Sequence, residues 1–182
     1  MSVPSRSKRK RFFIAVEGES EQSFVRWLQL LLTEKNLPVH LDTHPLGGGG
    51  FESMLRKALQ ANSRGRIKGT YVAQFLIVDE DRANNGDWPL TKLRAEATGY
   101  NISLIVQRTN HEALLYRLIS GRVNDVLSAN RVQSALRHYW LDYEKPATAN
   151  QLRTRLDLKK LQQVAAIDND LTTLLQGIGL LT

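Results

Sequence analysis

Short apolar runs alternate with segments of helical periodicity along the first 120 residues. Apolar or alternating runs predict four strands, at Phe12–Val16, Pro38–Leu46, Tyr71–Val78 and Asn101–Gln107. Apolar residues three and four apart predict helices between them, beginning near Ser20, Phe51 and Pro89. This alternation predicts an α/β fold with a mostly parallel four-stranded sheet flanked by helices.

No strand pattern follows Asn124, and helices are predicted at 127–143, 147–164 and 168–181. We therefore divide the chain into a basic flexible arm at 1–10, an α/β domain at 11–121 and a C-terminal helical extension at 122–182, packed on the same domain. The extension mixes basic residues with an aromatic group, Tyr139, Trp140 and Tyr143. It could form a nucleic-acid face, but helical spacing favours a core role for the aromatics.

Acidic residues follow two of the predicted strands. Glu17 ends the first apolar run before a turn at Gly18, and Glu21 lies in the first turn of the next helix. Asp79 and Asp81 follow the third run, and they project to the same side if the chain stays extended. Open α/β sheets bind ligands at the carboxyl ends of their strands. We therefore expect these carboxylates to meet in one site.

Two motifs carry a family resemblance. Val16-Glu17-Gly18 and Asp79-Glu80-Asp81 resemble the Glu-Gly and Asp-x-Asp motifs of the Toprim domain of primases, topoisomerases and overcoming-lysogenization-defect nucleases. The stretch VEGESEQSFVRWL, with a later Asn110-His111-Glu112 before a bulky helix, resembles the RloB-like abortive-infection proteins. The resemblance covers about residues 11–120 and implies a Toprim-like fold. The catalytic residues expected from it are Glu17, Glu21, Asp79, Asp81 and Glu112, with Glu17, Asp79 and Asp81 as metal ligands.

Such a set of ligands is made of oxygen atoms alone. Hard oxygen ligands select Mg²⁺ or Mn²⁺, and clustered carboxylates repel one another unless a cation neutralises them. One or two such ions can bind a phosphodiester and activate a water molecule. We therefore expect phosphodiester hydrolysis of DNA or RNA, with Arg82 and Arg108 as candidates for stabilising the transition state.

Basic residues are concentrated at the amino terminus. The chain has 25 Lys and Arg against 18 Asp and Glu, and residues 1–11 hold five of the basic residues and no acid. Lys8, Arg9, Lys10 and Arg11, together with Arg82 and Arg108, are candidate nucleic-acid contacts. A solvated tail is the alternative for the arm.

Two further features each have two interpretations. The loop Gly47–Gly50 precedes a helix and could hold a phosphate through its N–H groups, although no Gly-Lys-Ser/Thr follows. A flexible turn is the alternative. His111 could be a ligand or general base, or could take an ordinary exposed or capping role, while Asn110 is expected to cap the following helix.

Composition excludes several classes of protein. The chain has no Cys, so it has neither disulfides nor thiolate metal ligands. No apolar stretch is long enough to span a membrane and no secretion signal is visible, so we expect a cytoplasmic protein.

Three functional hypotheses follow. The first is a metal-dependent nuclease that acts in antiphage defence, where the RloB-like resemblance implies a partner ATPase of the ABC/SMC-like type. The second is a non-catalytic Toprim subunit or toxin that docks on such an ATPase through the C-terminal helices. An exposed apolar stripe at Leu171, Leu174, Leu175 and Ile178 would favour it, and burial of that stripe would remove this support. The third is a small RNA-processing Toprim ribonuclease, and a homo-oligomer remains an open alternative.

Overall fold

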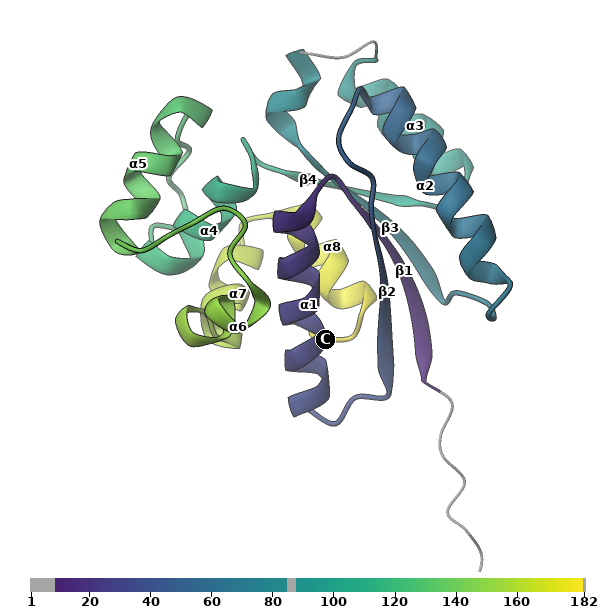
Figure 1. The fold of residues 1–182 in the computed structure, drawn as a ribbon, viewed down its shortest axis with the longest axis horizontal. Helices are drawn as coiled ribbons and strands as arrows, with labels where there is room; N and C mark the ends of the chain where they lie inside the picture. The colour runs from purple at the N-terminus through teal and green to yellow at the C-terminus, as the bar shows by residue number, and fades with distance from the viewer. Residues whose placement is uncertain (1–8, 85–87, 182) are drawn as a thin grey trace, which may run out of the picture.

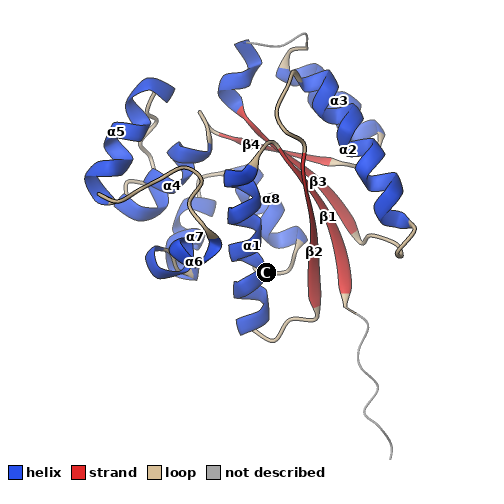
Figure 2. Cartoon of the chain, viewed as in Figure 1, coloured by secondary structure: helices blue, strands red, loops and turns tan. Residues whose placement is uncertain are grey.

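Four parallel strands form one sheet at the centre of the protein (Figure 2). They are β1 (Lys10–Val16), β2 (Val39–Pro45), β3 (Ala73–Asp79) and β4 (Ser103–Gln107). The order across the sheet is β2-β1-β3-β4, and each neighbouring pair is parallel. The predicted α/β fold with a four-stranded sheet is therefore confirmed, and the sheet is entirely parallel.

The computed structural model describes residues 9–84 and 88–181 (Figure 1). The helices in these ranges are α1 (Glu19–Glu34), α2 (Phe51–Arg66), α3 (Leu90–Gly99), α4 (His111–Ser120), α5 (Ala129–Tyr139), α6 (Ala149–Arg155), α7 (Leu158–Ala165) and α8 (Asn169–Gly177), with a 3-10 turn η1 (Glu80–Asn84) after β3. Within these ranges, no helix combines the length and the apolar content that crossing a bilayer requires.

Helices cover both faces of the sheet, as Figures 1 and 2 show. On one face, Phe13 of β1 is buried in a core with residues of α2 and α3. On the other face, Ile14 of β1 is buried with residues of α1, α4 and the C-terminal helices. Successive side chains of a strand point to opposite faces, so the continuous apolar run of β1 fills both cores.

The C-terminal helices belong to the second of these cores. The stripe Leu171, Leu174, Leu175 and Ile178 is buried there. It is therefore not available to dock a partner, and the support it would have given to the docking hypothesis is removed. Trp140 and Tyr143 are also buried, with ring centroids 5.1 Å apart, so these two aromatics serve the core.

The predicted single helix at 147–164 is two helices in the structure. α6 ends at Arg155, and the side chain of Asp157 accepts a hydrogen bond from the backbone N–H of Lys160 at 2.9 Å. This bond caps a new helix, α7, with its own direction. The short interruption lets Leu152, Leu156 and Leu161 all reach the core, where each is buried.

The order of the strands brings two strand ends together. From β1 the chain crosses to β2 on one side of the sheet, and later places β3 on the other side of β1. β1 and β3 are therefore neighbours at the point where the strand order reverses. They pair in parallel with Val16 opposite Ile77, so Glu17 and Asp79 lie side by side at the carboxyl ends of these two strands. This is the position at which open α/β sheets bind ligands.

Candidate functional site: a carboxylate cleft between strands β1 and β3

A cleft of about 370 Å³ lies where β1 and β3 end, and it is bordered by the strand-end acids. Its lining residues include Glu17, Glu21, Asp79, Arg82 and Lys145. We call it the carboxylate cleft. Glu17 and Asp79 are 5% and 8% exposed, and the backbone N–H of Asp79 points to Oε2 of Glu17 at 3.5 Å. The expectation that these two acids meet is confirmed by this geometry.

Glu21 is held beside Glu17 by the start of α1. Its Oε2 accepts a hydrogen bond from the backbone N–H of Gly18 at 2.9 Å, as a carboxylate three residues after a helix N-cap commonly does. The bond satisfies one free N–H at the helix start and fixes the side chain in the cleft. Glu21 is itself buried.

Arg82 is the main cationic partner of Glu17. Its Nε lies 2.7 Å from Oε1 of Glu17, and Arg82 remains about half exposed while Glu17 is buried. Burial raises the pKa of Glu17, and the charge of Glu21 adds to this, whereas the Arg82 charge acts in the opposite direction. The net pKa of Glu17 remains above its ordinary value.

Asp79 is the most strongly perturbed acid of the cleft. Burial, followed by the nearby charges of Glu21, Glu17, Asp81 and Glu112, raises the pKa of Asp79 to about 9. Its Oδ1 atom is buried and has no hydrogen-bond partner among the residues that the structure describes. A buried carboxylate oxygen without a partner, surrounded by other carboxylates, is an electrostatically unfavourable arrangement that a bound cation would relieve.

Asp81 does not follow the geometry expected from the sequence. The chain does not stay extended after Asp79, because Glu80–Asn84 forms the 3-10 turn η1. Asp81 instead accepts a hydrogen bond from Nδ2 of Asn110 at 3.2 Å, and its backbone N–H donates to Thr109 O at 2.9 Å. The two acids of the Asp-x-Asp motif are therefore separated. Asp79 lines the cleft, and Asp81 binds the loop before α4.

Glu112 lies at the start of α4 and is buried. Nζ of Lys145 lies 2.7 Å from its Oε1, and the hydroxyl of Tyr143 donates to the same oxygen at 3.3 Å. Burial alone would raise the pKa of Glu112, but Lys145 holds it below its ordinary value. Sequence reasoning did not find Lys145 as a cleft residue, because only the folded path of residues 140–148 brings it there.

His111 is in the core and outside the cleft. It is 1% exposed, its Nδ1 lies 3.0 Å from Nε2 of Gln107, and its ring meets the edge of Phe24. Burial lowers the pKa of His111, so the neutral ring is favoured. Asn110 caps α4 as predicted, since its side chain accepts from the backbone N–H of Ala113 at 3.1 Å. The structure therefore favours a structural role for His111.

The glycine loop before α2 borders the same cleft. Gly47 and Gly48 line it and have φ of 72° and 68°, which L residues rarely adopt. The side chain of Lys57 donates two hydrogen bonds to the loop, from Nζ to Leu46 O at 2.9 Å and to Gly48 O at 3.0 Å. The glycines are therefore needed for the loop conformation, and both interpretations of the loop remain open.

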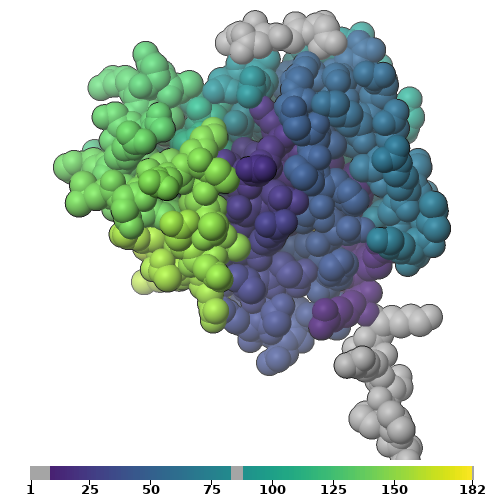
Figure 3. Space-filling model, viewed as in Figure 1, coloured from purple at the N-terminus to yellow at the C-terminus, as the bar shows by residue number. Residues whose placement is uncertain are grey.

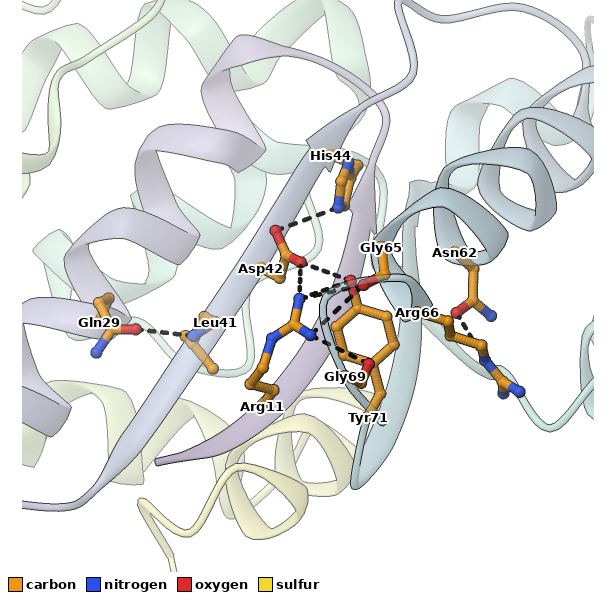
Figure 4. Close-up of polar contacts among 10 residues, drawn as sticks. All are labelled: Arg11, Gln29, Leu41, Asp42, His44, Asn62, Gly65, Arg66, Gly69 and Tyr71. Atoms are coloured by element: carbon orange, nitrogen blue, oxygen red, sulfur yellow. Dashed lines mark hydrogen bonds and ion pairs between the residues drawn. The ribbon is translucent and has the colours of Figure 1, made fainter. Parts of the chain in front are cut away.

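The amino-terminal basic residues lie at the other end of β1 from Glu17. Lys8 is outside the described residues, and Arg9 and Lys10 are exposed. Figure 4 shows Arg11 bonded to Asp42 and stacked on Tyr71, with Nη2 at 2.7 Å from Oδ2 of Asp42. Arg11 therefore has a structural role that ties β1 to β2 and to the loop before β3.

Arg108 is also away from the carboxylate cleft. It lines a separate hollow of about 320 Å³ together with Arg94 and Asp170, beside β4 and α8. Of the two predicted transition-state cations, only Arg82 borders the cleft.

The carboxylate cleft has the donor chemistry of a divalent-cation site. In the described part of the chain, no three Asp, Glu or His side chains are already arranged as metal ligands. The reason is visible in the contacts, because Glu17 binds Arg82, Glu21 binds Gly18 and Glu112 binds Lys145. The oxygen-only donors and the unpartnered Oδ1 of Asp79 nevertheless fit Mg²⁺ or Mn²⁺.

Three comparisons with known proteins found no relative of this chain. The chain matches no protein-family model, no curated protein and no solved structure. The Toprim resemblance therefore rests on the two motifs at Glu17 and Asp79, and the fold itself is an all-parallel four-stranded α/β sheet flanked by helices.

Proposed function

We propose that this protein is a divalent-metal-dependent nuclease that hydrolyses phosphodiester bonds in the carboxylate cleft. The observation that carries the proposal is Asp79, a buried acid at the switch point of the sheet. Its Oδ1 has no partner in the described ranges, and burial with the charges of other acids raises its pKa to about 9. A hard divalent cation is the ligand that such a group accommodates.

Asp79 and Glu17 would hold the ion, with Glu21 beside them. A bound Mg²⁺ or Mn²⁺ would polarise the phosphodiester and lower the pKa of a water molecule. Arg82 contacts Oε1 of Glu17, so Oε2, which faces Asp79, would be the oxygen that holds the ion, and the half-exposed guanidinium of Arg82 would have further N–H groups for phosphate oxygens. The buried walls around Glu17 and Asp79 strengthen these interactions by lowering the local dielectric. We extend the proposal to antiphage defence with a partner ATPase, which the RloB-like motif supports.

A non-catalytic subunit is the second candidate. It is favoured by the internal ion pairs of the cleft, Glu17 with Arg82 and Glu112 with Lys145, which partly neutralise the acids without any ligand. In this case the carboxylate cleft only maintains the shape of the protein.

Cleavage assays separate the two candidates. Plasmid DNA, single-stranded DNA and tRNA are incubated with the full chain and Mg²⁺ or Mn²⁺. Wild type is compared with Glu17→Gln and Asp79→Asn, and Glu96→Gln, an exposed position on α3, is the matched control. We expect cleavage by wild type and the control, and none by the two cleft variants. Cleavage that survives both cleft substitutions in folded protein would overturn the nuclease proposal.

A further inference from the structure

The outer surface of α2, which faces solvent in Figure 3, carries basic side chains beyond the first helical turn, and that first turn holds the exposed acid Glu52. Between Glu52 and Asp79 the chain has five Lys and Arg residues and no Asp or Glu. Four of these five, Arg56, Arg64, Arg66 and Lys68, are exposed. We call these four residues the α2 basic strip. It is distinct from the basic residues of the C-terminal extension.

The α2 basic strip leads away from the carboxylate cleft. Gly47 and Gly48, which line that cleft, stand just before α2. At 3.6 residues per turn, Arg64 and Arg66 lie about 80° to either side of Arg56, so the three share the outer half of the helix, with Glu52 one turn before Arg56. A helix of 16 residues is about 24 Å long, so the strip extends from near the cleft to the opposite end of the sheet, as the path of α2 in Figure 1 shows.

At its far end the strip meets the amino-terminal basic residues. Nη1 of Arg11 donates to the carbonyl of Gly69 at 3.1 Å, which places the start of β1 against the end of α2 (Figure 4). The exposed Arg9 therefore extends the positive surface, whereas Lys10, one position before Arg11 in β1, lies on the opposite face of the sheet. The nearby acid, Asp42, is already bound to Arg11 and to the hydroxyl of Tyr71, at 2.7 and 2.5 Å.

The charges of the α2 basic strip are not neutralised by the protein. In the described ranges, none of its four residues forms an ion pair. In the C-terminal extension, Arg153 pairs with Glu34 at 2.8 Å and Arg155 with Asp142 at 3.2 Å, whereas Arg131, Arg137 and Lys159 form no ion pair in the described ranges and can therefore serve as matched controls. Unpaired cations in a row are the arrangement that phosphate backbones bind.

We propose that the α2 basic strip binds the phosphate backbone of a nucleic-acid strand and guides it between Arg9 and the carboxylate cleft. The direction given to the bound strand rests on the proposed function, because the strip leads to the cleft in which cleavage would occur. Exposed Ile67 and Val72, at 86% and 62%, adjoin the far end and would also suit an anionic lipid surface. The linear path toward the carboxylate cleft favours nucleic acid.

Binding is measured without cleavage, in the Asp79→Asn background. The test variant carries Arg56→Glu, Arg64→Glu and Lys68→Glu. The matched control carries the same change of charge at exposed positions on α5 and α7, as Arg131→Glu, Arg137→Glu and Lys159→Glu. Fluorescence anisotropy with labelled oligothymidine and oligouridine of about 20 nucleotides is followed across a salt series. The two oligomers distinguish DNA from RNA.

We expect the test variant to bind at least tenfold more weakly than its parent, with the control within twofold. The slope of log K against log salt should fall by about 2, since each single-strand phosphate contact contributes about 0.7. A set of Gln substitutions at the same three positions should give a smaller loss of affinity, and circular dichroism checks that each variant is folded.

Equal binding by the test variant and its parent would overturn the inference, as would an equal loss in the control. Binding of wild type to phosphatidylserine vesicles but to neither oligomer would also overturn it. If wild type does not cleave but the test variant still loses affinity, the strip is supported and the nuclease proposal fails. If wild type cleaves and the three strip substitutions alone change neither cleavage nor binding, the nuclease proposal stands and the strip fails.

Discussion

Nε of Arg82 lies 2.7 Å from Oε1 of Glu17 and shields a buried carboxylate that has other acids beside it. Removing the guanidinium would leave Glu17 without this neutralising charge. We expect Arg82→Gln to lower the free energy of unfolding at pH 7, without divalent ions, by about 1 kcal/mol, because Arg82 is half exposed and its pair is partly screened.

Urea denaturation measures this change. Arg108→Gln is the matched control, because Arg108 is exposed and outside the carboxylate cleft, and it should stay within about 0.5 kcal/mol of wild type. Addition of Mg²⁺ should restore most of the loss in Arg82→Gln. A variant as stable as wild type in metal-free buffer would show that the ion pair contributes little.

Asp79 makes stability depend on pH in a direction opposite to that of most acids. Its folded pKa is about 9 against a usual value of 3.8, so the folded protein binds a proton more tightly than the unfolded chain. Stability contributed by this group is present below pH 4 and is lost as the pH rises toward 9. We expect Asp79→Asn, in metal-free buffer at pH 8, to be more stable than wild type by about 2–3 kcal/mol.

The difference between Asp79→Asn and wild type should nearly vanish at pH 4, which denaturation at both pH values can test. Asp142→Asn, an exposed acid near the end of α5, is the control and should show no such trend. Equal stability of Asp79→Asn and wild type at pH 8 would mean that the pKa of Asp79 in the folded protein is close to its ordinary value.

Divalent ions should stabilise wild type through the carboxylate cleft. A ligand at about 100 times its dissociation constant adds about 2.7 kcal/mol to the free energy of unfolding. We therefore expect Mg²⁺ or Mn²⁺ to raise the melting temperature of wild type, and EDTA to reverse the change. Asp79→Asn should respond weakly, whereas Glu96→Gln should respond as wild type does. Identical shifts in all three proteins would place the bound ions outside the cleft.

Side chains bind two backbone groups on each of the two edge strands, β2 and β4. On β2, Gln29 accepts from the N–H of Leu41 at 2.8 Å (Figure 4). It also donates to Val39 O at 3.2 Å, so it replaces two contacts of a neighbouring strand. On β4, Asp170 accepts from the N–H of Val106 at 2.9 Å, and Arg94 donates to Leu104 O at 3.2 Å. Such contacts discourage pairing between exposed edges.

We expect Gln29→Ala to destabilise the protein by about 1 kcal/mol and to speed hydrogen exchange of the Leu41 amide, because two backbone groups lose their partners. Gln133→Ala, at an exposed position of α5, is the control. Light scattering would show whether β2 then associates with other molecules. Unchanged exchange at Leu41 would mean that water replaces Gln29 without loss.

The sequence predicted the α/β fold with its four-stranded sheet and the proximity of Glu17 and Asp79, because both depend on local pattern and sheet topology. Apolar runs defined the strands, and acids after two parallel neighbours had to meet, as Glu17 and Asp79 do. The expected position of Asp81 assumed an extended chain after Asp79, whereas Glu80–Asn84 forms a 3-10 turn and the N–H of Asp81 donates to Thr109 O, a contact with a residue far along the chain that local pattern does not predict. The break between α6 and α7 was missed because helical periodicity runs through Leu156.

Lys145 was not identified from the sequence because its position, like that of Asp81, depends on tertiary contacts. It is one basic residue among several in its segment, and only tertiary folding places its Nζ 2.7 Å from Oε1 of Glu112. We expect Lys145→Met to raise the pKa of Glu112, since burial would then act without opposition from the lysine charge. NMR titration of the Glu112 carboxyl carbon measures this directly.

The same substitution should alter stability with a defined pH dependence. The pKa of Glu112 is held below 4.5 in the folded protein, so its contribution to stability is present above that pH and is lost as the pH falls through the folded pKa. We expect Lys145→Met to be about 1 kcal/mol less stable than wild type at pH 7, because Lys145 is half exposed and its pair is partly screened, with the difference shrinking as the pH falls below 4. Lys159→Met, at an exposed position of α7, should match wild type at both pH values. A loss of stability that stays constant with pH would mean that Lys145 acts through packing of its aliphatic chain, because loss of packing does not depend on the ionisation of Glu112.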